Sequence, residues 1–174
     1  MGMELLAYDH LDVFHTGEEL VRAKRDQIEG IITILPWIAT IDAFQHWMYT
    51  HPDHTREQRR DHWLVLRKRF GGTEDYSGYE QILARQWQRQ LHLFEVPFYY
   101  IEYGIAQLGA LQVWRSAKQN HVQALADYRN ALALGGSRPL PDLFEAAGIK
   151  WDFSVDTLEP LVGALQDELN ALDD

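Results

Sequence analysis

Residues 92–110 read HLFEVPFYYIEYGIAQLGA, and this stretch indicates a loop followed by a helix. Tyr100 and Tyr103 are three residues apart, so they share one face of a helix. Apolar side chains mark a different face, at Phe98, Ile101, Ile105 and Leu108. Small residues allow a neighbouring helix to approach closely, at Gly104, Ala106, Gly109 and Ala110. The stretch therefore predicts a tightly packed helix that presents two phenol groups.

The two phenols lie at the start of this helix, close to a loop histidine, His92. Phenol hydroxyls placed in this way can donate hydrogen bonds to a carbonyl oxygen or to an oxyanion. The same spacing also fits aromatic packing in a core, with the hydroxyls reaching the surface. Spacing alone leaves both interpretations open.

The rest of the chain has the apolar period of a helix, with almost no segments of period two. Helix starts are predicted from capping residues, at Thr16 with Glu19, Thr55 with Gln58, Asn120, and Asp156. The sequence shows no hairpin signal, repeat or low-complexity tract. It predicts an all-α fold of seven or eight helices, in a single helical domain over residues 1–174.

Two prolines are expected to shape the longest helices. Pro36 lies inside an apolar helical pattern and should kink that helix or restart it, because proline lacks an N–H and clashes with the preceding turn. Pro97 suits the first position of a helix from Phe98 to about Lys118. Before it, one further helix is expected to carry Ile82, Leu83, Trp87 and Leu91.

Composition excludes several classes of protein. The formal net charge is -10, and no basic stretch is long enough to follow a phosphate backbone, so we expect no nucleic-acid partner. The chain has no cysteine, which excludes disulfides and thiolate metal sites. We find no signal peptide and no uninterrupted apolar run of the roughly 18–20 residues that span a bilayer. We therefore expect no membrane partner and a cytoplasmic location.

Residues 92–110 resemble the oligoendopeptidase F branch of the thimet-oligopeptidase family of zinc oligopeptidases. That branch has a histidine, a short loop, Pro-Phe-Tyr-Tyr, an acidic residue with tyrosine, and then a helix of small residues. Residues 1–6, MGMELL, look like the helix segment just past the family's third zinc ligand. Other matches lie at Phe44-Gln45-His46-Trp47, Tyr49, Pro52, Arg69-Phe70 and Trp87. The resemblance covers essentially the whole chain and implies the C-terminal helical half of a thimet-oligopeptidase-like fold.

The resemblance also implies roles for individual residues. Family members are zinc metalloendopeptidases that cleave short peptides through a zinc-bound water. Tyr103 matches the tyrosine that stabilises the oxyanion, and His92 matches the substrate-binding histidine. Tyr100 matches a second tyrosine that holds the substrate, and Tyr99 and Glu95 line the same segment.

The departure from the family is large, because the chain contains no His-Glu-x-x-His motif. Glu4 matches a glutamate that does not itself bind the zinc, so all three zinc ligands and the catalytic base are missing. We therefore expect an incomplete catalytic domain that binds no zinc alone and becomes a peptidase only with the missing N-terminal half. The chain starts inside an apolar helical pattern, at Met3, which predicts an exposed apolar face and self-association.

Other functions remain alternatives at this point. The chain could be a free-standing helical binding or scaffold module without catalysis. A di-iron oxidase bundle would need two carboxylate-x-x-His units, and only Asp12-x-x-His15 is present. The pairs His51 with His54 and Asp42 with His46 lack a third ligand. A basic cluster is interpreted as the solvated face of one helix, at Arg56, Arg59, Arg60, Arg67, Lys68 and Arg69.

Overall fold

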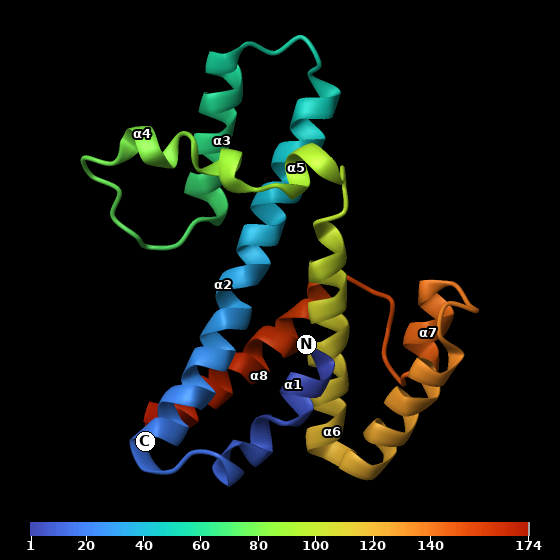
Figure 1. The fold of residues 1–174 in the computed structure, drawn as a ribbon. Coiled ribbons are helices and arrows are strands. Elements are labelled where there is room, and N and C mark those ends of the chain that lie inside the picture. Colours follow the sequence, from blue (N-terminus) through green and yellow to red (C-terminus); the bar gives the residue numbers. More distant parts are fainter. Residues whose placement is uncertain (174) are drawn as a thin grey trace. The chain divides into compact units, whose positions relative to one another are not determined.

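The computed structural model describes residues 1–173, and within that range it contains helices and no strand (Figure 1). The all-α prediction is confirmed. The α-helices are α1 (Gly2–Leu6), α2 (Gly17–Thr50), α3 (Arg56–Phe70), α4 (Glu80–Leu83), α5 (His92–Glu95), α6 (Ile101–Leu134), α7 (Leu140–Ala146) and α8 (Val155–Asp173). Two short 3-10 helices complete the order, η1 (Tyr8–Val13) and η2 (Gln86–Arg89).

The chain forms two compact units. Unit 1 contains residues 1–31 together with the chain from residue 105 onward, and unit 2 contains residues 32–104. The long helices α2 and α6 each contribute residues to both units. The expectation of a single domain over residues 1–174 stays a prediction.

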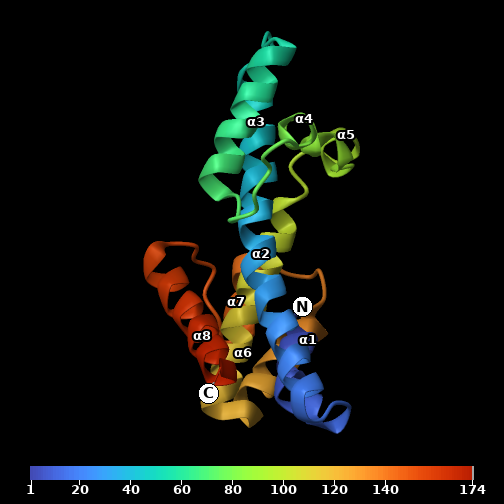
Figure 2. The ribbon, with the colours of Figure 1, turned by 90° about the vertical axis from the view of Figure 1, so that its left-hand side faces the viewer.

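Unit 2 is built on an aromatic core between the second half of α2 and α3, which lie side by side in Figures 1 and 2. Phe44 and Trp63 are both fully buried, with their rings 5.1 Å apart in an edge-to-face arrangement. The Trp63 indole N–H donates to the Leu83 carbonyl at 2.8 Å, so the residue that anchors the core also fixes the segment after α3. Burial of large aromatic side chains is the main source of stability here.

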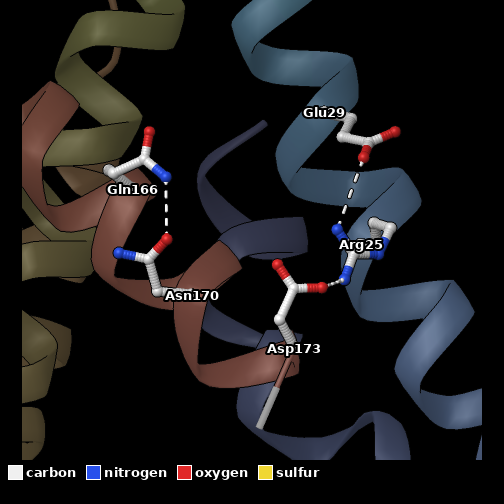
Figure 3. Close-up of polar contacts among 5 residues, drawn as sticks. All are labelled: Arg25, Glu29, Gln166, Asn170 and Asp173. Atoms are coloured by element: carbon white, nitrogen blue, oxygen red, sulfur yellow. Dashed lines mark hydrogen bonds and ion pairs between the residues drawn. The ribbon is translucent and has the colours of Figure 1, made fainter.

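Unit 1 has its own core, and ion pairs connect its helices. Tyr8 and Trp114 are buried and meet edge to face at 6.4 Å. Arg25 lies between two carboxylates, with Glu29 one helical turn away and Asp173 at the end of α8 (Figure 3). In the same view, Gln166 donates to Asn170 at 2.9 Å along α8. Lys118 on α6 also pairs with Glu168 of α8, so α8 is tied by charge to two other helices.

Some of the predicted helix caps are present in the structure and others are not. The box at Thr55 and Gln58 is confirmed, since each side chain bonds to the other residue's backbone N–H. Asn120 interrupts α6 with φ -151° and ψ 89°, and its side chain accepts from the Gln123 N–H at 3.2 Å. The Asp156 cap is wrong, because α8 begins one residue earlier and Asp156 lies inside its first turn.

Helix α2 continues through Pro36, so of the two expected outcomes the restart is wrong, and the kink stays a prediction. The Thr40 hydroxyl donates to the Pro36 carbonyl at 2.8 Å. The single helix expected to carry Ile82 to Leu91 is wrong, because this segment forms two short helices, α4 and η2. The next short helix, α5, occupies residues 92–95, where a loop was expected. The bond from Trp63 to the Leu83 carbonyl holds α4 at its last residue, which local sequence does not reveal.

By length and composition, one helix among the described residues, α2, is apolar enough to cross a membrane. Core helices share these properties, and α2 supplies the buried residues Ile38, Ile41 and Phe44. The expectation of no membrane partner stays a prediction.

Candidate functional site

The segment that leads into α6 differs from the expected helix. Pro97 and Phe98 lie in a turn, and α6 begins only at Ile101, so Pro97 is not its first residue. Phe98 has a φ of 60°, in the left-handed region that L-residues seldom occupy. Its N–H donates to the Gln45 side-chain oxygen at 2.8 Å, and its ring packs on His46 at 4.8 Å. These contacts with α2 hold the turn and thereby set where α6 starts.

The turn brings the predicted site residues together. The His92 ring lies 4.8 Å from the Tyr100 ring, 5.7 Å from Tyr103 and 6.2 Å from Tyr99. The Tyr100 and Tyr103 rings are 5.2 Å apart. Tyr100 precedes the first residue of α6, and its carbonyl accepts from the Tyr103 N–H at 3.3 Å. Glu95, also singled out in the sequence, ends α5 and is exposed.

A chain of hydrogen bonds orients this cluster. The Trp37 indole N–H is 3.3 Å from the Gln90 side-chain oxygen. The Gln90 amide nitrogen is 2.7 Å from Nδ1 of His92, and Nε2 of His92 is 3.4 Å from the Tyr103 hydroxyl. An indole N–H can only donate, so the Gln90 oxygen must face Trp37 and the amide NH₂ must face His92. His92 therefore accepts at Nδ1, and the proton of the neutral ring lies on Nε2.

This tautomer decides what Tyr103 can do. Because Nε2–H of His92 donates to the Tyr103 oxygen, the hydroxyl hydrogen of Tyr103 is left to donate elsewhere. His92 and Tyr103 are half-buried, and the Tyr99 side chain is exposed beside them. The arrangement thus presents an oriented phenol donor on a partly desolvated aromatic surface.

Tyr100 is held in its neutral form. Burial raises the pKa of the Tyr100 phenol, and hydrogen bonding to Trp37 and Gln90 offsets part of that rise. Burial favours the uncharged form of a phenol. A phenol with the ordinary pKa of 10 is already protonated at pH 7, and the raised pKa extends the pH range in which Tyr100 can donate.

Three residues that orient the site were not identified as functional in the sequence: Trp37, Gln90 and Gln45. Gln45 is fully buried on a helix whose other buried residues are mostly apolar. In the sequence, the one signal for it is a polar residue within the apolar pattern of this helix. Two guanidinium groups lie over the Trp37 ring, from Arg67 at 5.5 Å and Arg89 at 5.8 Å. Their roles depend on contacts between residues about 50 apart.

The residues described do not form a metal site. Among residues 1–173, no group of three or more His, Asp or Glu side chains is placed to hold a metal ion. Asp42 and His46 pair with each other at 3.6 Å, and Glu4 pairs with the terminal ammonium of Met1 at 2.7 Å. In the turn after α2, Nε2 of His54 accepts from Arg59 at 2.7 Å, so it is not free to bind a metal. The zinc implied by the family resemblance therefore does not fit these residues alone.

Comparisons with known proteins agree on the family. PZ peptidase A, solved with an inhibitor, has a TM-score of 0.88 and 29% identity over 98% of this chain. A Bacillus anthracis strain Ames protein assigned as an oligoendopeptidase F has a TM-score of 0.76 and 26% identity over 99% of the chain. The chain spans 30% and 28% of the length of these two structures. None of the curated proteins compared with the sequence matches it. The sequence model of Peptidase family M3 matches residues 1–161 of this chain, and the chain belongs to that family.

Proposed function

We propose that this chain supplies the substrate-binding and oxyanion-stabilising side of an M3 metalloendopeptidase that cleaves short peptides. The proposal is supported by the family membership and by the hydrogen-bond chain from Trp37 to Tyr103. The observation that carries it is the contact between Nε2 of His92 and the Tyr103 hydroxyl oxygen. With the His92 proton on Nε2, the Tyr103 hydroxyl hydrogen is available to a substrate oxygen.

In this proposal, Tyr103 donates to the oxygen of the peptide carbonyl as negative charge develops on it. Such a donor is effective when it is oriented before the reaction, because no reorganisation is needed as the charge develops. His92 contacts the substrate and also holds Tyr103 in its donating state. The neutral phenol of Tyr100 and the exposed ring of Tyr99 contact the peptide beside it.

Residues 1–173 form no metal site, and the sequence has no His-Glu-x-x-His motif to supply the family's base, so a complete peptidase would need both from elsewhere. A second function is therefore kept, that of a helical peptide-binding module without catalysis. Both functions require the aromatic cluster to contact the peptide. Only the first requires Tyr103 to increase the rate of peptide cleavage.

Peptide contact can be tested on the chain itself. A short peptide is titrated into protein with isotopically labelled tyrosine, and the ring resonances are followed by NMR. We expect saturable shifts at Tyr99, Tyr100 and Tyr103, and weaker binding in Tyr103→Phe. Tyr79→Phe is the matched control, because Tyr79 is 61% exposed and lies outside the cluster. Shifts confined to tyrosines outside the cluster would contradict both functions.

A further inference from the structure

A cavity in unit 2, separate from the cluster around Tyr103, is lined by arginines. It has a volume of about 400 Å³ and lies between the first turns of α3 and the segment from α4 to η2. Arg56, Arg59 and Arg60 line it from α3, and Arg85 lines it from the opposite segment. Arg56 and Arg60 are exposed, as expected for a solvated face, and together with Arg59 and the exposed Arg85 they line this hollow.

The charges in this cavity are not balanced by the residues around it. Arg60 is paired with Asp61, at 2.7 Å and 2.9 Å, and Glu57 is the one carboxylate of the lining. Arg56 and Arg85 make no hydrogen bond or ion pair through their side chains with any residue of the described range 1–173. The lining thus holds four guanidinium groups and one carboxylate, and Asp61 pairs with Arg60 from outside the lining, in a chain whose net charge is -10.

Arg59 is held more rigidly than its neighbours. Its Nε donates to His54 at 2.7 Å, and its guanidinium lies over the Trp87 ring at 5.6 Å. Trp87 also packs against Phe44 at 5.6 Å and Phe94 at 6.0 Å. The cavity therefore offers charge rather than a free aromatic face, and Gln81 and Gln88 add amide groups to its lining.

We propose that this cavity binds a compact anion with two or more negative charges. Guanidinium groups bind phosphate and carboxylate oxygens through paired, charge-assisted hydrogen bonds. One carboxylate would not match the excess charge of the cavity, whereas a diphosphate or a tricarboxylate would. The proposal is independent of the peptidase role, because none of its arginines belongs to the cluster around Tyr103.

The test is calorimetric titration of the purified chain with pyrophosphate and, separately, with citrate, at matched ionic strength. The wild-type chain should bind at least one of the two, and the ratio of their affinities identifies phosphate or carboxylate as the preferred group. Each arginine removed should weaken binding about tenfold, the lower range for a charged hydrogen bond. The double variant Arg56→Gln/Arg85→Gln should therefore bind about a hundredfold more weakly.

The control is Arg138→Gln, which makes the same charge change at an exposed arginine of unit 1. Circular dichroism should show equal melting for all variants, because Arg56 and Arg85 make no side-chain hydrogen bond within the described residues. The single variants Arg56→Gln and Arg85→Gln are measured as well, in case the double variant fails to fold. Failure of both anions to bind wild type, or equal weakening by Arg138→Gln, would overturn the proposal.

Discussion

At the scale of single residues, the site depends on the direction of one side-chain amide. Gln90 is oriented by an indole that can only donate, and it orients His92 in turn. The His92 tautomer then leaves the Tyr103 hydroxyl hydrogen free to donate to another group. The family resemblance identified His92, Tyr100 and Tyr103, but Trp37 and Gln90 gain their roles from contacts distant in sequence. Local sequence has no signal for such contacts.

The first prediction concerns the tautomer of His92. Long-range proton–nitrogen NMR spectra of the chain should show the ring proton on Nε2, because Nδ1 accepts from Gln90. In Gln90→Leu that acceptor role is lost, and the two tautomers should mix. A wild-type ring protonated on Nδ1 would contradict the hydrogen-bond chain.

The second prediction concerns Gln45, whose side-chain oxygen accepts from the Phe98 N–H. Gln45→Leu leaves that N–H without its partner, which should lower the free energy of unfolding by about 1–3 kcal/mol. Gln119→Leu, at an exposed position of α6, should change it by no more than about 0.5 kcal/mol. Urea unfolding measures both variants, and equal effects would show that the Phe98 turn does not depend on Gln45.

At the scale of elements, local signals predicted some boundaries and missed others. The Thr55 and Gln58 box lies wholly within four residues, so the start of α3 could be read directly. The start of α6 could not, because Phe98 occupies a positive φ that its own sequence disfavours and that the contact with Gln45 supports. The same limit explains the division of residues 80–95 into three short helices.

The third prediction concerns pH and the junction between α2 and α3. His62 of α3 stacks on Trp47 of α2 at 4.3 Å, and Trp47 also stacks on His51 at 4.9 Å. Burial, and then the charge of His51, lowers the pKa of His62 below its ordinary value of 6.5. A His with a lowered folded-state pKa contributes stability that is fully present above pH 6.5 and is lost as pH falls through the folded value.

We therefore expect the free energy of unfolding to fall less in His62→Gln than in wild type when the pH is lowered from about 7.5 to about 5.5, a range that spans the titration of His62. Urea unfolding at the two pH values gives the comparison. His10→Gln serves as the control, because His10 is exposed in η1 of unit 1. Equal losses in His62→Gln and wild type would show that His62 does not contribute to the pH dependence.

At the scale of the whole molecule, the fourth prediction is that the chain alone does not cleave peptides. Residues 1–173 bring together no three side chains that could bind zinc, and a catalytic zinc needs about three protein ligands. A quenched fluorescent peptide should stay intact with zinc added, and dialysed protein should hold no stoichiometric metal. Turnover that a chelator abolishes would refute this expectation.

The fifth prediction is that the chain associates through exposed apolar side chains. Val13, Phe14 and Val122 are each more than 70% exposed, so their apolar side chains are available for contact with a second copy. Light scattering during size-exclusion chromatography should show a mass that grows with concentration, and a hydrophobic dye should bind. A monomer at all concentrations with no dye binding would count against an uncovered apolar face.

The most direct test of the central claim is Tyr103→Phe, made at the matching position of a longer peptidase of similar structure such as PZ peptidase A. The phenyl ring is kept, so melting should change little, while one donor to the oxyanion is removed. We expect turnover to fall roughly 10²–10³-fold, or about 3–4 kcal/mol in activation free energy. A lowered melting temperature with unchanged turnover would contradict the account and show that Tyr103 only packs in the core.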